Sequence, residues 1–318
     1  DKDFHWFNRY RVTDGFSVFG GRSTLVFEPE KQTNLVVAQR EMAILDQMTG
    51  YRDERIWSIA QGKGDITIDD SKTEPFIPVI SNKPGPGPNG THLFLDGGDE
   101  AISKMTVHPG MEIKLFASEK QFPELINPVQ MATDSKGRVW VACWPMYTHW
   151  RPKDPVNDSL LILEDTNGDG TADKRITFAG DLHNPTGFEF YGGGVLVANT
   201  PDLLFLKDTD GDDKADVRVR ILNGLDSADT HHASNSFAFD PGGAVYFQEG
   251  TFHQTQVEST WGPPARCSNG GVFRYEPRTQ KFSVYVTHGF ANPHGHVWDR
   301  WGNDIVHDGT GSQPYPGW

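Results

Sequence analysis

The C-terminal two thirds of the sequence repeats one arrangement of apolar and polar positions. Each copy has a short strand-like segment, a turn that contains glycine and a second, more apolar strand. The copies are residues 131–142, 188–198, 237–247 and 296–306, and their first residues lie 57, 49 and 59 positions apart. Short strands that recur at this period without helical patterning are typical of β-propeller blades. We therefore predict an all-β fold, a β-propeller with about four blades, over residues 99–318.

Four such hairpins do not complete a propeller. A sandwich of stacked sheets would not produce one recurring hairpin, whereas a closed propeller with blades of this size needs six or more blades, on the order of 300 residues. We expect an incomplete, truncated propeller with open edges and a chain that is part of a longer protein.

The N-terminal part has a different pattern. Residues 1–60 are predicted to form a small α+β extension, with a hairpin and one amphipathic helix that ends at Gly50. The apolar face of the helix consists of Leu35, Ala38, Met42, Leu45 and Met48. Residues 61–98 include a proline- and glycine-rich run at 83–90, a composition typical of a linker.

Two acidic loops recur 43 residues apart, at residues 165–173 and 208–216. Positions 1, 3, 5 and 9 of each loop carry side-chain oxygens, which can converge on one hard cation that binds six to eight oxygens at ~2.3–2.6 Å. The predicted calcium ligands are Asp165, Asn167, Asp169 and Asp173 in the first loop and Asp208, Asp210, Asp212 and Asp216 in the second. The alternative is a solvated turn without a metal.

These loops differ from an EF-hand. Position 12 is Ile176 in one loop and Val219 in the other, where an EF-hand has a bidentate glutamate, and the flanking segments are strand-like. Gly170 at position 6 permits the sharp bend, whereas Asp213 takes that position in the second loop and strains it. We expect calcium turns between β-strands, with the first loop as the better site.

Charge and composition narrow the class of partner. The chain has 29 Lys and Arg against 43 Asp and Glu, a net charge of −14, which argues against nucleic acid and anionic membrane surfaces. No apolar run has the ~18 residues of a membrane span. Cys143 and Cys267 form no metal or haem motif, and their spacing leaves a disulfide undecided. Calcium binding favours an extracytoplasmic location, periplasmic or secreted, although the sequence begins at Asp1 without a signal peptide.

Hairpin geometry predicts where a site would lie. Adjacent strands are antiparallel, so residues just before the first strand and just after the second share one rim around the central channel. Seven of the twelve histidines fall at or near this rim. The rim residues are Gln130, Trp144, His183, Asn184, Asn199, His231, His232, Glu249, His253, Asn292, His294, His307 and Asp308, with His296 nearby. Such a cluster indicates a general-base or metal site or a cofactor-binding floor; histidines that cap exposed strand ends are the alternative.

Residues 105–318 resemble the propeller of the membrane-bound dehydrogenases of planctomycetes and verrucomicrobia. The resemblance rests on residues 115–119, 127–131, 183–188 and 289–295, on the two acidic loops and on the pair His231-His232. It implies a PVC-type haem-binding protein, in which haem c and a c-type cytochrome partner belong to another domain of the same longer chain. Residues 1–60 resemble the tail that follows an SGNH-type hydrolase in some of these proteins.

The propeller is more distantly similar to the soluble quinoprotein sugar and sorbosone dehydrogenases, which bind pyrroloquinoline quinone together with calcium. Their general base precedes an inner strand, and His232, before residues 237–242, is the matching position. In their quinone-binding motif Asn292 matches, His294 replaces a glutamine, and Ala291 replaces an arginine that would pair with quinone carboxylates. The similarity implies that His183, Asn292 and His294 contact the cofactor.

Together these features predict a dehydrogenase-like module of an extracytoplasmic redox protein that oxidises a sugar or alcohol. His232 would take the hydroxyl proton as hydride leaves for the quinone. The rim residues expected to contact the substrate are His231, Glu249, His253, Asn199, Trp144, His307 and Asp308. Two other classes stay open: a calcium-stabilised propeller that binds carbohydrate or protein without catalysis, and a hydrolase or lyase that uses the rim histidines with a divalent metal.

Overall fold

The computed structural model describes residues 2–10, 26–27, 32–75, 98–147 and 149–317. The first sheet consists of β3 (Pro128–Thr133), β4 (Val139–Cys143), β5 (Asp158–Glu164) and β6 (Lys174–Leu182). The second consists of β7 (Phe188–Tyr191), β8 (Gly194–Asn199), β9 (Asp202–Lys207) and β10 (Val217–Asn223). The third consists of β11 (Asn235–Phe239), β12 (Val245–Glu249), β15 (Gly271–Glu276) and β16 (Lys281–Val286). The fourth consists of β17 (Pro293–Trp298), β18 (Asp304–Asp308) and β19 (Gln313–Pro316).

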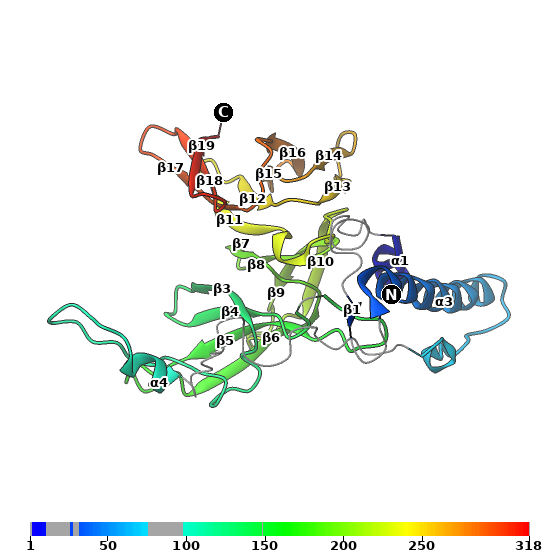
Figure 1. Cartoon of the computed structure of the whole chain (residues 1–318), viewed down its shortest axis with the longest axis horizontal. Coiled ribbons are helices and arrows are strands. Elements are labelled where there is room, and N and C mark those ends of the chain that lie inside the picture. Colours follow the sequence, from blue (N-terminus) through cyan, green and yellow to red (C-terminus); the bar gives the residue numbers. More distant parts are fainter. Residues whose placement is uncertain (1, 11–25, 28–31, 76–97, 148, 318) are drawn as a thin grey trace.

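These four antiparallel sheets follow one another along the chain and form an arc (Figure 1). In each sheet the strands lie in sequence order, and the first strand β11 lies beside the first strands β7 and β17 of its neighbours. Sheets that succeed one another around a common centre are propeller blades. The structure therefore confirms the predicted β-propeller of about four blades with a small N-terminal extension. An unpredicted hairpin, β13 (Gln254–Val257) and β14 (Ala265–Ser268), is inserted between β12 and β15.

Apolar side chains fill the spaces between neighbouring sheets. Because successive side chains of a strand point to opposite faces, one strand contributes to two cores. Val197 of β8 packs with Leu160 of the first sheet, whereas its neighbour Leu196 packs with Phe247 of the third. Each of these side chains is fully buried, which stabilises the fold by about 1.5–3 kcal/mol per residue. The inter-sheet packing fixes the blades relative to one another, and with them the rim.

The N-terminal extension contains α1 (Lys2–Tyr10), the short strands β1 (Val26–Phe27) and β2 (Gln32–Thr33), and α3 (Asn34–Ala60). The predicted end of the long helix at Gly50 is wrong, because α3 continues to Ala60. Nothing lies within 4 Å of the position that a Cβ of Gly50 would take, and four of the next ten residues, Arg52, Glu54, Arg55 and Ala60, are good helix formers. The helix ends instead where Gly62 adopts a φ of +69°.

Helix α3 packs on the propeller. Its buried residues Ile44, Leu45 and Met48 form one core with Trp144, Met146 and Trp150 of the connection between β4 and β5. Figure 1 shows α1 and α3 side by side at the edge of the arc. No helix in the described ranges is long and apolar enough to cross a membrane.

The segment that follows α3 is folded against it in part. Asp70, in the short helix η1 (Asp70–Lys72), accepts two hydrogen bonds from the buried guanidinium of Arg52, at 2.8 and 2.9 Å. The proline- and glycine-rich residues 83–90 of the predicted linker lie outside the described residues. The chain enters the propeller through α4 (Gly98–Ser103).

Candidate functional site

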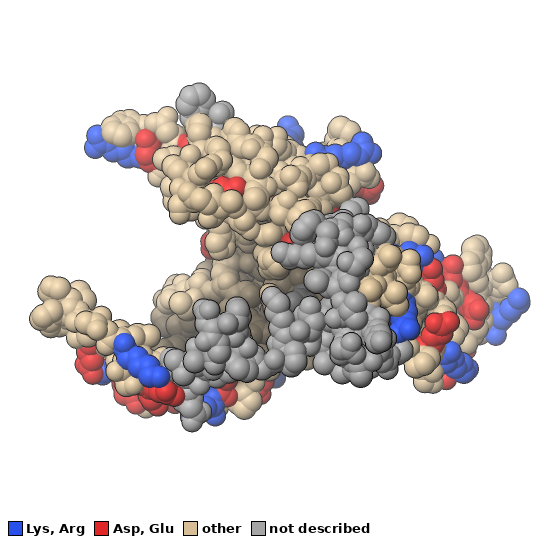
Figure 2. Space-filling model, in the orientation of Figure 1, with Lys and Arg blue, Asp and Glu red and all other residues tan. Residues whose placement is uncertain are grey.

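A cavity lies where the predicted rim residues of the four blades meet. Its volume is about 300 Å³, at the lower end of the range for small-molecule sites. The wall includes Trp144, Thr186, His231, His232, Asn292 and His294. These residues stand at the starts of first strands or after second strands, which is the geometry that antiparallel hairpins impose. Figure 2 shows a hollow on the inner side of the arc, with the charged side chains mostly on the outer parts of the molecule.

His232 is one of the residues of this wall. It belongs to the single-turn helix η2 (Thr230–His232), just before β11, and its backbone carbonyl accepts the N–H of Gly250 at 2.9 Å. A Cβ on Gly250 would lie 3.0 Å from the His232 ring and 2.7 Å from the Ala291 carbonyl. Residue 250 must therefore be glycine for the end of β12 to pass so close behind the imidazole.

Two side chains flank the His232 ring. Its Nδ1 lies 3.1 Å from Asp229 Oδ2, and its Nε2 forms a short hydrogen bond with Asn292 Oδ1. The Asn292 amide nitrogen in turn donates to Thr310 Oγ1. A line of polar groups thus crosses the wall from the third blade to the fourth.

Asp308 holds Asn292 in place. Its carboxylate accepts the backbone N–H groups of Ala291 at 2.8 Å, Asn292 at 3.0 Å and Thr310 at 2.8 Å. Burial alone would raise the pKa of Asp308, but these backbone donors outweigh burial and keep the pKa below its usual value. Asp308 is therefore an ionised anchor beneath the loop, and its own side chain does not line the cavity.

Asp229 connects His232 with the second histidine of the pair. Asp229 Oδ1 lies 3.2 Å from Nδ1 of His231, whose half-exposed ring is 4.7 Å from the His232 ring. Burial would raise the pKa of Asp229, but His232, His231 and His253 together hold it below its usual value. One ligand atom from each of Asp229, His231 and His232 lies within 4.8 Å of the others. Asp229 did not enter the sequence prediction, although it stands three residues before His232 in the same turn.

His294 and Trp144 both line the cavity. His294 Nδ1 lies 3.1 Å from Ser236 Oγ and 3.3 Å from Asn235 Oδ1. The buried indole of Trp144 packs edge-on against Tyr147. Both residues were predicted at the rim, and the structure places both in the wall.

Glu249 and His253 lie behind the wall. His253 is fully buried; its Nε2 donates to the backbone carbonyl of Asp229 at 2.9 Å, and its Nδ1 is 3.6 Å from Glu249 Oε2. Burial would lower the pKa of His253, but Glu249 and Asp226 raise it to about 9. These two predicted rim residues therefore support the turn that carries Asp229 from behind.

Three further predicted residues lie outside the cavity wall. His183 is buried, donates from Nδ1 to the Thr200 carbonyl at 2.6 Å and packs edge-on against Phe4 of α1. Asn199 accepts the His183 N–H at 2.9 Å, and the partly buried His307 lies on β18. The roles assigned to His183, Asn199 and His307 stay predictions.

The acidic loops stand at the opposite ends of the blades. The first loop joins β5 to β6 and the second joins β9 to β10. Strand β5 runs from the buried Asp158, near the rim, to Glu164, directly before the first loop. At ~3.3 Å per residue its length separates the loops from the cavity by about 20 Å. An ion in either loop would therefore act on stability, and it would not contact a molecule in the cavity.

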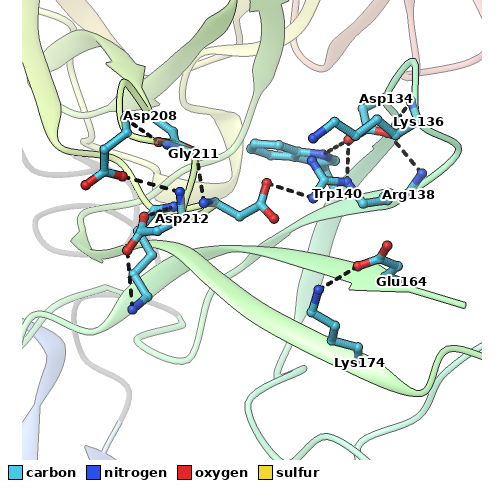
Figure 3. Close-up of polar contacts among 12 residues, drawn as sticks. Asp134, Lys136, Arg138, Trp140, Glu164, Lys174, Asp208, Gly211 and Asp212 are labelled. Atoms are coloured by element: carbon cyan, nitrogen blue, oxygen red, sulfur yellow. Dashed lines mark hydrogen bonds and ion pairs between the residues drawn. The ribbon is translucent and has the colours of Figure 1, made fainter. Parts of the chain in front are cut away.

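The second loop gathers the denser group of carboxylates. Oxygens of Asp208, Asp210 and Asp216 lie within 4.8 Å of one another, while Asp212 is turned toward Lys214. In the first loop Asp165 accepts three backbone N–H groups, Asp169 accepts the Thr171 N–H, and Asp173 accepts the Thr166 hydroxyl. Figure 3 shows the second loop and its surroundings.

Asp213 explains why the second loop lacks glycine at position 6. Its φ is +61°, so it has the left-handed backbone predicted there, and its carboxylate lies 2.8 Å from Nη1 of Arg138. Arg138, in the turn of the first blade, also contacts Asp134 at 2.9 Å, and Asp134 accepts from the Trp140 indole (Figure 3). Asp213 thus adopts an unfavourable backbone conformation, and its side chain forms an ion pair that links two blades.

Comparisons with known proteins give one family match and several distant structural similarities. Residues 98–313 match the family described as Domain of unknown function (DUF7133). No curated protein matches the sequence. Among solved structures, a gluconolactonase from Xanthomonas campestris superposes with a TM-score of 0.38 at 18% identity, covering 58% of this chain and 55% of that one. The pyranose dehydrogenase PQQ domain from Coprinopsis cinerea gives a TM-score of 0.38 at 11% identity, covering 60% and 48%. A calcium structure of a family AA12 carbohydrate-active enzyme from Trichoderma reesei gives 0.31 at 14%, covering 57% and 52%, so the chain spans about half the length of these proteins.

Proposed function

The chain belongs to the DUF7133 family, and we propose that its propeller cavity binds a sugar or another small alcohol and that catalysis centres on His232. The observation that carries the proposal is the placement of His232 in the cavity wall between Asp229 and Asn292. A carboxylate beside an imidazole orients the ring and stabilises the imidazolium that forms when the imidazole accepts a proton.

The composition of the wall supports an uncharged, hydroxylated ligand. Amide, hydroxyl and imidazole groups of Asn235, Asn292, Thr186 and His294 offer both donors and acceptors, and the largely buried Trp144 adds an apolar part to the wall. No lysine or arginine belongs to the described lining. A ligand with several carboxylates would therefore find no strong cation in this wall.

One form of the proposal is the dehydrogenase-like oxidation expected from the sequence, in which His232 accepts the hydroxyl proton of the alcohol. The residues present do not fit pyrroloquinoline quinone well. The quinone carries carboxylates, Ala291 has no side chain to pair with them, and the Ala291 N–H already donates to Asp308. We therefore assign no hydride step through that cofactor, and the reaction would need a separate electron acceptor.

A second form is hydrolysis or elimination with a divalent metal. The group of Asp229, His231 and His232 favours it, because two imidazoles and one carboxylate are ligands of catalytic metal sites. We extend the proposal to calcium in the acidic loops as a stabiliser, to an extracytoplasmic location, and to a c-type cytochrome domain as redox partner of the oxidative form.

The test is a substrate screen with matched variants. The protein is incubated with aldoses, polyols and their lactones, with and without an artificial electron acceptor and with and without added Zn²⁺ or Mn²⁺. We expect His232→Ala to lower the rate by about 10²–10⁴-fold, whereas His108→Ala, an exposed histidine of a turn, leaves it unchanged. Turnover that requires the acceptor identifies the oxidative form, and turnover without it identifies the hydrolytic form. Sugar binding by calorimetry with no turnover under any condition would refute catalysis and leave a binding propeller.

A further inference from the structure

We propose that Asp229, His231 and His232 bind one divalent transition-metal ion of the Zn²⁺ type, with an open coordination position toward the cavity. The inference deepens the proposed function, since it concerns the same cavity. Its first support is geometric. Nδ1 of His231 lies 3.2 Å from one oxygen of Asp229 and Nδ1 of His232 lies 3.1 Å from the other, and ligands of a tetrahedral zinc ion with bonds of about 2.0–2.1 Å are roughly this far apart.

The hydrogen bond on the far side of His232 gives the second support. The group of Asn292 that faces His232 is its amide oxygen, which only accepts, and the amide nitrogen donates to Thr310. With this orientation of the amide, a proton on Nε2 of His232 completes the hydrogen bond. In that tautomer Nδ1 carries a lone pair.

That lone pair faces negative charge. Nδ1 of His232 is buried and lies 3.1 Å from Asp229 Oδ2. A lone pair and a carboxylate at this distance are held together by a cation between them, which is either a proton or a metal ion. A metal ion bound by Nδ1 of both histidines and by Asp229 would serve all three groups at once.

The surroundings have the form expected around a metal ligand. A metal-binding histidine usually donates its other N–H to a carbonyl or carboxylate, which fixes the ring, and Asn292 provides that carbonyl here. The turn that carries the ligands is held from behind by His253, through the Asp229 carbonyl, and by Gly250, through the His232 carbonyl. A site with two nitrogens and one oxygen selects a borderline ion, in contrast to the all-oxygen acidic loops that suit calcium.

The open position would face the cavity, because His231 and His232 both line it. An oxygen of water or of a sugar hydroxyl bound there loses its proton to solvent more readily than in bulk water. His232 would then act as a ligand in the loaded protein and would not be the base itself. The rate would depend on His232 whether it is the base or a metal ligand. Metal binding must therefore be measured separately from turnover.

The experiment titrates Co²⁺ and Zn²⁺ alone into the metal-free protein by calorimetry, and follows the visible absorption of bound Co²⁺, which reports nitrogen ligation and a low coordination number. We expect one site with nitrogen-type Co²⁺ bands. His231→Gln, at a half-exposed ring, and Asp229→Asn should each weaken Co²⁺ binding at least 10–100-fold. Circular dichroism melts verify that both variants fold.

Two controls separate this site from others. His294→Gln changes a histidine of the same cavity wall outside the trio, and Asp210→Asn changes the second acidic loop. Both should leave the Co²⁺ affinity and spectrum unchanged. Equal Co²⁺ binding in the wild type, His231→Gln and Asp229→Asn would overturn the inference, as would the absence of a nitrogen-ligated Co²⁺ spectrum. Neither result would bear on a metal-free reaction of the cavity, so the proposed function can survive or fail separately.

Discussion

Asp158 accepts the backbone N–H of Asn184 at 2.8 Å with one carboxylate oxygen, and that of Met146 at 3.0 Å with the other, from a completely buried position. It joins the first blade to the connection that leads into the second. Burial raises the pKa of Asp158 to about 7, against the opposing effect of the two N–H donors.

This buried carboxyl predicts a pH dependence of stability. Because the folded-state pKa lies above the unfolded value of 3.8, the native state binds the extra proton between these values. The contribution of the protonated Asp158 carboxyl to the free energy of unfolding is fully present below about pH 4. It amounts to a few kcal/mol and is lost as the pH rises through 7. Urea unfolding from pH 4 to 8 measures it. Asp158→Asn should flatten the slope in this window, and an unchanged slope would contradict the assignment.

Calcium is expected to stabilise the protein through the acidic loops, because clustered carboxylates repel one another unless a cation lies between them. Calcium at about 100 times its Kd would add ~2.7 kcal/mol, a rise of several degrees in Tm. Asp210→Ala should remove the part of this gain that comes from the second loop. Asp212→Ala, which is turned toward Lys214, is the matched control and should keep most of it. Equal melting curves with calcium and with chelator would rule out the site.

The ion pair between Arg138 and Asp213 predicts how much stability three substitutions remove. Arg138 is buried, so Arg138→Ala leaves Asp134 and Asp213 without their cation and should cost about 3 kcal/mol of unfolding free energy. Asp213→Gly and Asp213→Ala both lose the ion pair, but only glycine relieves the φ of +61°, so the glycine variant should be more stable by about 1 kcal/mol.

Denaturant titration measures this series. The exposed pair Lys174 and Glu164 in the same region, drawn in Figure 3, is the control: Lys174→Ala should cost less than about 1 kcal/mol. An Asp213→Ala protein as stable as Asp213→Gly would show that the backbone argument is mistaken.

Gly250 predicts a way to displace His232 without changing it. In Gly250→Ala the new methyl group would lie 2.7 Å from the Ala291 carbonyl and 3.0 Å from the His232 ring, so the Ala291 backbone, the ring or both must shift. We expect a loss of about 1–3 kcal/mol of stability together with reduced binding at the cavity. Gly180→Ala, in β6 and outside the described lining, meets its nearest atom at 4.0 Å and should be tolerated. Calorimetry with the best ligand of the substrate screen compares the two; equal affinities would disprove the close packing.

The repeat of hairpins was enough to predict the blades and the end at which they meet, because the antiparallel rule depends only on strand order. It could not decide side-chain direction. His183 and His232 both precede a first strand, yet the His183 ring turns to Phe4 of α1 while the His232 ring turns to the cavity. That difference comes from contacts with segments far away in the sequence, which no local pattern records.

The acidic loops also depend on a contact that the local sequence pattern does not record. The sequence ranked the first loop higher because Gly170 suits the bend, whereas the structure gathers three carboxylates in the second. The second loop bends without glycine because a residue outside it takes part: Arg138 of the neighbouring blade forms an ion pair with Asp213, whose backbone is left-handed like that of Gly170. The β13–β14 hairpin was missed because it has no counterpart in the other blades.

The core shared by α3 and the first blade affects where the polypeptide can be cut for expression. A polypeptide trimmed to the family boundary at residue 98 would leave the side chains of Trp144, Met146 and Trp150 without the apolar face of Ile44, Leu45 and Met48. Because Trp144 is also part of the cavity wall, such trimming would remove support from one side of the cavity. It would also expose an apolar surface that promotes aggregation. The cooperative folding unit of this region therefore extends across the family boundary, and expression for binding studies should retain the first helices.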